Sequence, residues 1–238
     1  GILIGADAVN AGLADRLDGN MDIDPALRDD LIAARRAGEA ATRKNLAPYD
    51  TLFDGLADAG GDEYLWVRDI TLSNSMWGNR MMTLRGPRDG VHATGGGIGQ
   101  GLPMAIGAAL AAPDRQVLCL TGDGGLQLCI GELATLAESG ARVLVLVMND
   151  QGYGVIRNIQ DAHYDGRHGY TDVLTPKFAE LCAAVGVAHR RISDLGEAGA
   201  VLAGALALNG PVMVEVDMPA IGDFATSFAG PPVRTKAI

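Results

Sequence analysis

Apolar residues along this chain follow two patterns: short continuous runs, and longer segments in which they recur every three or four positions. The run from Val143 to Val147 is wholly apolar, as in a parallel strand that is covered on both faces. After Gly125, one stripe of a helix is apolar, at Leu126, Leu128, Ile130, Leu133 and Leu136. The alternation of the two patterns predicts an α/β fold, a doubly wound and mostly parallel sheet with helices on both faces.

The same patterns place the individual elements. We expect strands at residues 64–70, 116–121, 142–148 and 212–216. We expect helices at residues 51–59, 103–111, 126–139, 176–185 and 196–208.

The beginning of the chain differs from this alternation. Residues 1–20 predict a strand and a short helix, and residues 25–43 predict a polar helix. Because the chain opens directly on an apolar run, we expect the later part of a longer polypeptide or one subunit of a split enzyme. The expected divisions are a linker after a preceding domain (1–45), the α/β domain (46–218) and an irregular tail (219–238).

Composition and charge exclude several classes of protein. The 238 residues are 48% hydrophobic and 20% charged, which is enough apolar content for a sizeable core. A net charge of -10 and a pI of about 4.7 disfavour binding to nucleic acid or to an anionic membrane surface. No apolar stretch approaches the roughly 20 residues needed to cross a bilayer. With no basic-then-apolar leader, we expect a cytoplasmic protein.

The cysteines lie singly within apolar runs, at Cys119, Cys129 and Cys182. This spacing fits neither a zinc site nor a disulfide framework. We expect small buried residues in a protein from a reducing compartment.

Two polar motifs follow predicted strands. Gly122-Asp123-Gly124-Gly125 comes after one strand, and Asn149-Asp150-Gln151-Gly152 comes after the next. Strands that deliver oxygen ligands to one edge of a parallel sheet can hold a divalent cation against a phosphate group. Asp123, Asp150 and the carbonyl of Gly152 are therefore candidate Mg²⁺ ligands.

Glycines beside these ligands suit a phosphate. The turn before the helix that follows Gly125 would present backbone N–H groups, and the absence of side chains lets a phosphate approach closely. Gly-Asp-Gly is also an ordinary turn sequence, so the first motif alone leaves both interpretations open.

The spacing of the two motifs resembles the thiamine diphosphate motif of the acetolactate synthase, benzoylformate decarboxylase and pyruvate decarboxylase family. The segment from Gly96 to Gly107 is similar to the part that holds the cofactor's pyrimidine ring, and Gly131–Thr135 and Tyr153–Arg157 resemble the acetolactate synthases. The resemblance covers residue 46 to the tail and implies the thiamine diphosphate-binding fold, whereas residues 1–20 resemble the end of the family's central domain.

The resemblance implies roles for single residues. Asp123 matches the metal-binding aspartate, and Asp150 stands where most members have Asn, although catabolic acetolactate synthases also have Asp there. Ile98 matches the apolar residue that supports the bent cofactor, and the carbonyl of Gly96 matches an acceptor for its pyrimidine. The cofactor-binding candidates are Thr71, Ser73, Asn74, Gly96, Ile98, Gly122, Asp123, Gly124, Gly125, Asp150, Gly152, Tyr153 and Gly154.

The resemblance also implies an activity: thiamine diphosphate- and Mg²⁺-dependent decarboxylation of a 2-oxo acid, with carboligation. In the family, a glutamate on a different domain activates the cofactor, and this chain offers no candidate for it. We therefore expect activity only with a pyrimidine-binding domain from the rest of the polypeptide or from another chain. The expected assembly is a homodimer, a homotetramer or a split hetero-oligomer.

Other interpretations remain open at this point. Ile159 stands where biosynthetic synthases carry a Trp, so a simple 2-oxo-acid decarboxylase is an alternative, as is a non-catalytic cofactor-binding subunit. A dinucleotide site is weakly supported, because the glycine run 95–101 lacks the G-x-G-x-x-G spacing. His92 is a candidate for acid/base work. Phe224 and Phe228 of the tail are candidates to close the site, although the tail could equally wrap the surface.

Overall fold

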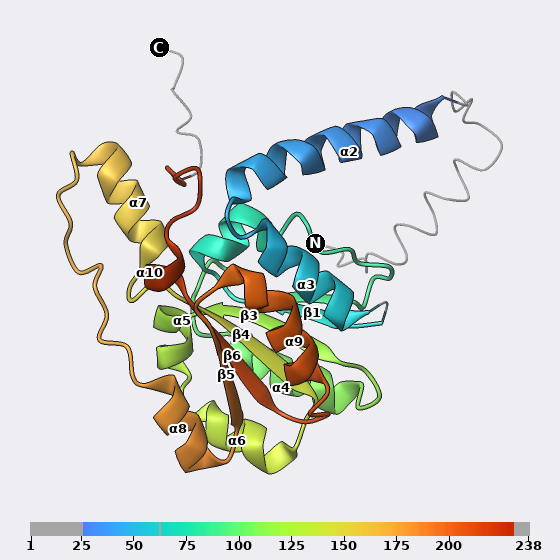
Figure 1. The fold of residues 1–238 in the computed structure, drawn as a ribbon, viewed down its shortest axis with the longest axis vertical. Coiled ribbons are helices and arrows are strands. Elements are labelled where there is room, and N and C mark those ends of the chain that lie inside the picture. Colours follow the sequence, from blue (N-terminus) through green and yellow to red (C-terminus); the bar gives the residue numbers. More distant parts are fainter. Residues whose placement is uncertain (1–25, 62, 231–238) are drawn as a thin grey trace, which may run out of the picture. The chain divides into compact units, whose positions relative to one another are not determined.

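The computed structural model describes residues 26–61 and 63–230 (Figure 1). The strand and helix predicted within residues 1–20 lie outside this part. The chain divides into two compact units, residues 1–41 and residues 42–238. A polar helix, α2 (Leu27–Leu46), begins in the first unit, and it confirms the helix predicted at 25–43.

A parallel sheet forms the centre of the second unit. Its strands, within the described residues, are β1 (Leu65–Arg68), β2 (Gly90–His92), β3 (Val117–Gly122), β4 (Val143–Asn149), β5 (Ala188–Ile192) and β6 (Val212–Asp217). Their order across the sheet is β2-β1-β3-β4-β6-β5, and every neighbouring pair is parallel. The predicted doubly wound α/β fold is confirmed.

Helices cover both faces of this sheet (Figure 1). The helices of the second unit are α3 (Asp50–Gly60), α4 (Gly101–Ala111), α5 (Asp123–Leu128), α6 (Glu132–Ser139), α7 (Gly154–His163), α8 (Phe178–Val185), α9 (Ala198–Leu206) and α10 (Met218–Ile221). Two short pieces complete them, the π-helix η1 (Asn74–Gly78) and the 3₁₀-helix η2 (Leu195–Glu197).

Alternate side chains of each strand pack into separate cores. In β4, Leu144 and Leu146 join the core under α3, α9 and η1, whereas Val143 and Val145 join the core under α4, α6 and α8. Successive residues of a strand point to opposite faces, so a strand between two layers must be apolar throughout. The continuous apolar run of β4 is explained by this burial.

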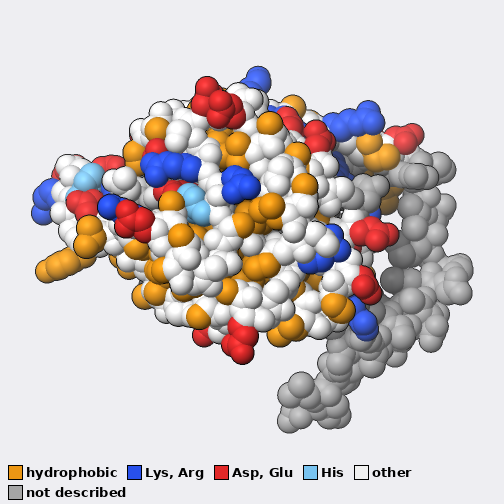
Figure 2. Space-filling view, turned by 60° about the horizontal axis from the view of Figure 1, so that its bottom comes forward, with side chains coloured by type: hydrophobic (Ala, Val, Ile, Leu, Met, Phe, Trp, Pro, Cys, Tyr) orange, Lys and Arg blue, Asp and Glu red, His pale blue; other side chains and the backbone are white. Residues whose placement is uncertain are grey.

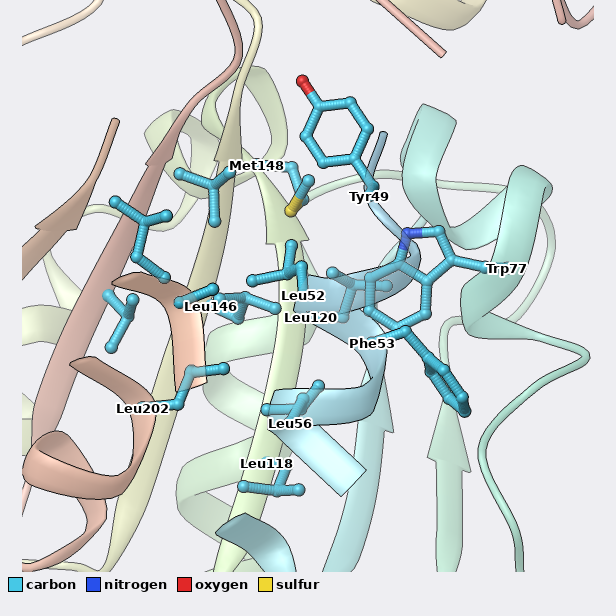
Figure 3. Close-up of a cluster of buried hydrophobic side chains, with 14 of the residues drawn as sticks. Tyr49, Leu52, Phe53, Leu56, Trp77, Leu118, Leu120, Leu146, Met148 and Leu202 are labelled. Carbon is cyan, nitrogen blue, oxygen red and sulfur yellow. The ribbon is translucent and has the colours of Figure 1, made fainter. Parts of the chain in front are cut away.

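Aromatic side chains close the first of these cores, around Trp77 (Figure 3). Trp77 is 1% exposed and contacts the rings of Trp66 and Phe53, with centroid distances of 6.0 and 6.2 Å. Leu120 of β3 lies beside it, and Leu146 of β4 belongs to the same cluster. The core therefore joins the middle of the sheet to α3 and η1.

Most predicted elements are confirmed within a few residues, and one is corrected. The helix predicted at 126–139 is two helices, because the chain turns at residues 129–131 between α5 and α6. Gly131, a poor helix former, lies in this turn. The first of these helices also begins earlier than predicted. Asp123 is the first residue of α5 and does not lie in a turn before the helix. The strands β2 and β5 were absent from the predicted set, because both are short and only partly apolar.

The surface and the cysteines add two observations. On the face drawn in Figure 2, acidic and basic side chains are interspersed among apolar ones, without a large region of one sign. No helix in the described part has the length and apolar content to span a membrane. Cys119, Cys129 and Cys182 are free, and Cys119 and Cys182 are buried, as predicted, whereas Cys129 is only half-buried.

Candidate functional site

The carboxyl ends of β1 and β3 form a switch point of the sheet. After β1 the chain continues to β2 on one side, and after β3 it continues to β4 on the other. Such diverging connections leave a crevice at the ends of the strands, where α/β proteins bind ligands.

A cavity of about 430 Å³ occupies this crevice. Its walls come from the segment after β1, the glycine loop before α4, and the segments after β3 and β4. Eleven of the thirteen predicted cofactor-binding residues line it: Thr71, Gly96, Ile98, Gly122, Asp123, Gly124, Gly125, Asp150, Gly152, Tyr153 and Gly154. The remaining wall is apolar, from Ile70, Leu72, Val155 and Ile156.

Asp123 is fully buried at the base of this cavity. Its Oδ2 accepts hydrogen bonds from the N–H of Gly152 at 3.1 Å and from the hydroxyl of Thr175 at 3.2 Å. Its Oδ1 has no hydrogen-bond partner among the described residues. An unpartnered buried carboxylate oxygen is costly, so this atom requires a proton or a cation.

Asp150 lies beside Asp123 and shares its environment. Burial and the charge of Asp123 raise the pKa of Asp150 to about 7, and the nearby cation of Arg157 opposes this rise. Burial also raises the pKa of Asp123. Two adjacent carboxyl groups cannot both ionise without cost, unless a cation is bound between them.

The segment after β4 holds Gly152 against the first turn of α5, which begins at Asp123. The Gly152 carbonyl oxygen lies 3.4 Å from the position that a Cβ on Gly124 would occupy. A Cβ on Gly152 would itself collide with the carbonyl oxygen of Thr171 and lie 2.5 Å from the Arg157 guanidinium. Glycine is therefore required at 152 for the backbone to approach this closely.

These oxygens form a mixed set of candidate metal ligands. No group of three or more His, Cys, Asp and Glu side chains that could hold a metal occurs within residues 26–61 and 63–230. The predicted set has two carboxylates and one backbone carbonyl, from Asp123, Asp150 and Gly152. Mg²⁺ takes oxygen ligands, usually one or two carboxylates together with waters and phosphate oxygens, and this set fits that preference.

A buried carboxylate that was not predicted, Asp69, fixes the glycine loop. Its Oδ2 accepts hydrogen bonds from the N–H groups of Gly99 at 2.9 Å and Gly101 at 3.1 Å, and its Oδ1 accepts from Ile70 at 2.8 Å. Asp69 is 0% exposed. The sequence could have identified Asp69 by the same pattern that identified Asp123, an acidic residue at the end of an apolar strand.

The glycine loop has a backbone that other residues rarely adopt. Gly95, Gly96 and Gly99 have φ values of 70°, 72° and 86°. A Cβ on Gly99 would also lie 2.8 Å from the Cβ of Leu128 in α5. Glycine is needed here because positive φ and close packing coincide. The loop holds Ile98, half-buried, in the wall of the cavity.

Three predicted site residues lie outside the cavity. Ser73 and Asn74 are buried, because the chain after Thr71 continues directly into η1 and carries them into the interior. Asn74 Oδ1 accepts a hydrogen bond from Arg68 at 3.1 Å. His92, an acid/base candidate, is exposed at the end of β2 and does not line the cavity of the described chain.

The described part of the tail packs beside the core, and neither of its phenylalanines lines the cavity. Phe224 is 9% exposed and stacks at an angle on Tyr49, with ring centroids 4.6 Å apart. Phe228 packs against the same core cluster. The tail begins with a helical turn, α10, and the expectation of a wholly irregular segment from residue 219 is corrected.

Comparison with known proteins gives a family match for this region. Residues 72–216 match the model described as "Thiamine pyrophosphate enzyme, C-terminal TPP binding domain". The matched range includes the metal-ligand candidates and the glycine loop.

Curated relatives match the same part of the chain. The acetolactate synthase large subunit of Parasynechococcus marenigrum (strain WH8102) is 37% identical over 146 residues, which are 60% of this chain and 24% of that protein. The acetolactate synthase isozyme 1 large subunit of Escherichia coli (strain K12) is 32% identical over 171 residues, 71% of this chain and 30% of that protein. The chain therefore spans about a quarter of the length of these relatives.

A solved structure has the same architecture. The thiamine diphosphate-dependent 4-hydroxybenzoylformate decarboxylase of Rhodococcus jostii RHA1 superposes with a TM-score of 0.63 at 29% identity. The match covers 69% of this chain and 31% of that one.

Proposed function

Because the chain belongs to the thiamine pyrophosphate enzymes, whose C-terminal TPP binding domain it contains, we propose that it forms the diphosphate- and magnesium-binding half of an acetolactate-synthase-like active site. The proposed reaction is the decarboxylation of a 2-oxo acid, followed by carboligation to a second carbonyl compound. The observation that carries this proposal is the buried, unpartnered Oδ1 of Asp123 beside Asp150 in the switch-point cavity.

The residues of the cavity fit the two groups that the family implies. Asp123, Asp150 and the Gly152 carbonyl would hold Mg²⁺, which would give the unpartnered oxygen of Asp123 a partner and remove the repulsion between the carboxylates. Thr71 and the glycines that follow β3 would face the diphosphate, and Ile98 would support the bent cofactor. Bound thiamine diphosphate would supply the carbon nucleophile that attacks a 2-oxo acid and the electron sink for decarboxylation.

The rest of the active site is proposed to come from elsewhere. The relatives are about four times as long as the matched region, and the chain offers no candidate for the glutamate that activates the cofactor in the family. We propose that a pyrimidine-binding domain, from the same polypeptide or another chain, completes the site. A homodimer, a homotetramer or a split hetero-oligomer would bring the two together.

The test compares the 238-residue chain with the intact assembly in thiamine diphosphate, Mg²⁺ and pyruvate, measuring CO₂ release and the products. The intact assembly is expected to release CO₂ and form acetolactate, and the chain alone is expected to be inactive. Robust turnover by the chain alone would overturn the proposed need for a second domain.

A ligand variant tests the metal site directly. Asp123→Asn should weaken Mg²⁺-dependent cofactor binding by more than tenfold. Mutation of residues that only hydrogen-bond to metal ligands already lowers metal affinity by about 10–100-fold. The control is Asp161→Asn. Asp161 lies on the exposed surface of α7, and its carboxylate pairs with His168, which follows the helix. Equal cofactor affinity in the two variants would contradict the assignment of Asp123.

A decarboxylase without carboligation is the second candidate function. It is supported by the structural similarity to a 4-hydroxybenzoylformate decarboxylase and by Ile159, which replaces the Trp of biosynthetic synthases. Release of a free aldehyde without a condensed product would favour it. Cofactor binding without any product, in the intact assembly, would instead indicate a non-catalytic subunit.

A further inference from the structure

A buried glutamate, Glu215, lies next to the candidate metal site without lining its cavity. It belongs to β6 and is 3% exposed. Its Oε1 accepts a hydrogen bond from the side-chain amide of Asn149 at 2.8 Å, and its Oε2 lies 3.1 Å from His189 Nε2. Arg191 lies 3.5 Å from Oε1. Three neighbouring strands, β4, β6 and β5, therefore meet at one carboxylate.

The surroundings of this carboxylate favour its ionised form in spite of its burial. Burial alone would raise the pKa of Glu215, but hydrogen bonds from His189 and Asn149 and the charge of Arg191 hold the pKa below its ordinary value. A buried charge is a poor source of stability compared with an apolar side chain of similar volume. Met213, which faces the same side of β6 two residues earlier, is apolar and fully buried. Glu215 instead lines a second cavity together with Asn149, His189 and Arg191, so apolar packing does not explain a glutamate at this position.

Glu215 fixes the orientation of the Asn149 amide. A carboxylate can only accept hydrogen bonds, so the Nδ2 of Asn149 must face Glu215 and its Oδ1 must face the opposite way. That Oδ1 accepts a hydrogen bond from the N–H of Gln151 at 3.2 Å. Gln151 has a φ of 56°, in the left-handed region that a residue with a side chain seldom adopts.

The strained turn at Gln151 leads directly to the metal-ligand candidates. Asp150 precedes it, and Gly152 follows it and donates its N–H to Asp123 Oδ2 at 3.1 Å. The carbonyl of Gln151 also accepts a hydrogen bond from the N–H of Val173 at 3.3 Å. A reversed Asn149 amide would place an NH₂ group against the N–H of Gln151, which would remove the side-chain hydrogen bond to this turn. The orientation of one amide thus contributes to the positions of the Asp150 carboxylate and the Gly152 carbonyl.

We propose that Glu215 is a positioning residue for the metal-binding turn, acting through the side-chain amide of Asn149. This inference rests on the proposed function, because it assigns Asp150 and Gly152 as ligands. Outer partners that orient metal ligands typically change metal affinity by about 10–100-fold when they are removed.

The same strand provides a matched control. Asp217 is two residues further along β6, is 8% exposed and binds Arg191 at 2.6 Å. Its Oδ2 also lies 3.4 Å from Ser193 Oγ. No hydrogen bond joins its carboxylate to Asn149 in the described structure. Removing it tests the loss of a buried, ion-paired acid without loss of the link to the turn.

The experiment compares Glu215→Leu, Glu215→Gln and Asp217→Leu in the intact protein. Mn²⁺ with thiamine diphosphate serves as the probe, and the electron paramagnetic resonance signal of free Mn²⁺ reports binding. Glu215→Leu should weaken Mn²⁺ binding by about 10–100-fold. Glu215→Gln, which retains an acceptor for Asn149, and Asp217→Leu should bind Mn²⁺ nearly as tightly as the natural protein.

Hydrogen exchange of the metal-free protein gives a second readout. In Glu215→Leu, the amides of Gln151 and Gly152 should exchange faster, whereas Asp217→Leu should leave them unchanged. If Glu215→Leu fails to fold, Asn149→Ala tests the same link with the His189–Glu215 pair intact, and it should show the same two effects.

Three results would each overturn the proposal. The first is an unchanged Mn²⁺ affinity in Glu215→Leu or, if that variant fails to fold, in Asn149→Ala. The second and third are a loss of Mn²⁺ affinity in Asp217→Leu, or in Glu215→Gln, as large as the loss in Glu215→Leu. If the natural protein binds no Mn²⁺, the proposed function is wrong, and the metal-free exchange measurement still decides whether Glu215 holds the turn.

Discussion

At Asp150 a carboxylate stands where most members of the family that the motif resembles have an amide. The structure places it against the buried Asp123, and burial together with that negative charge raises the pKa of Asp150 to about 7. Without a cation, a proton on one of the two carboxyl groups removes the repulsion between them. With Mg²⁺ bound, the same two carboxylates would become an advantage, because both would contribute negative charge to the ligand shell.

This arrangement predicts the pH dependence of the metal-free protein. The pKa of Asp150 is raised from 3.8 to about 7 on folding, so the folded state holds more protons between these values. Its contribution to the free energy of unfolding should therefore decrease as pH rises from about 4 to about 7, and should stay low above that range. Asp150→Asn carries no such charge and should be the more stable protein at pH 8, with a smaller difference at pH 5.

Thermal unfolding of both proteins in a chelator, at pH 5 and pH 8, measures this difference. A larger advantage of Asp150→Asn at pH 5 than at pH 8 would contradict the raised pKa. The resemblance to a family in which most members have Asn at this position implies that Asp150→Asn still binds Mg²⁺ and cofactor. Complete loss of cofactor binding would mean that the role of Asp150 is wrongly assigned.

At the scale of elements, the site is built from loops that the sheet holds in place. The glycine loop before α4 carries Gly96 and Ile98 into the cavity, and its hydrogen bonds to Asp69 tie it to the end of β1. The segment after β4 is tied to β6 through Asn149 and Glu215. In both places a buried carboxylate at a strand end fixes a backbone that has no regular structure of its own.

Asp69→Ala should loosen the glycine loop. The N–H groups of Gly99 and Gly101 would lose their acceptor, which costs about 1–3 kcal/mol for a buried donor left without a partner. Urea unfolding would measure the loss of stability, and limited proteolysis would show faster cleavage within residues 94–100.

The control is Asp54→Ala. It removes a half-exposed ion pair between Asp54 and Arg43 that contributes at most about 1 kcal/mol. Unchanged proteolysis of the loop in Asp69→Ala would refute this role of Asp69.

At the scale of the whole α/β unit, the two cores keep the strand ends in register. Leu120 of β3 lies opposite Arg68 of β1 and Leu146 of β4, so packing in the middle of the sheet determines how the ends of these strands line up. The Asp69, Asp123 and Asp150 segments all follow these three strands. Leu72 belongs both to this core and to the wall of the cavity, so the geometry of the cavity depends on the packing of the core (Figure 3).

Leu146→Ala tests how much this core contributes to stability. Leu146 is fully buried, and truncation of such a residue lowers the free energy of unfolding by about 2–5 kcal/mol. Leu174→Ala is the control, because Leu174 is 93% exposed and its truncation should change stability by less than about 0.5 kcal/mol. Chemical denaturation of both variants measures the difference, and an equal change in the two would contradict the assignment of Leu146 to the core.

Much of the fold and part of the candidate site could be predicted from the sequence, because their signals are local. The apolar run of β4 shows its burial on both faces, and Asp123 and Asp150 each directly follow a strand. Parallel strands end at one edge, so the meeting of these two carboxylates needed no tertiary information. The short strands β2 and β5 carried weak local signals, and the break between α5 and α6 was hidden by an unbroken apolar stripe.

Only the tertiary structure decided which distant groups complete the site. Asp69 binds Gly99 and Gly101 across 30 and 32 residues of chain, and Asn149 binds Glu215 across 66. It also turned Ser73 and Asn74 into the interior and Phe224 onto Tyr49. The sequence by itself determined the four central strands of the sheet and the candidate metal ligands, because apolar runs and the residues at strand ends are local features of the sequence. The partners of buried polar groups depend on burial and packing, which only the folded chain defines.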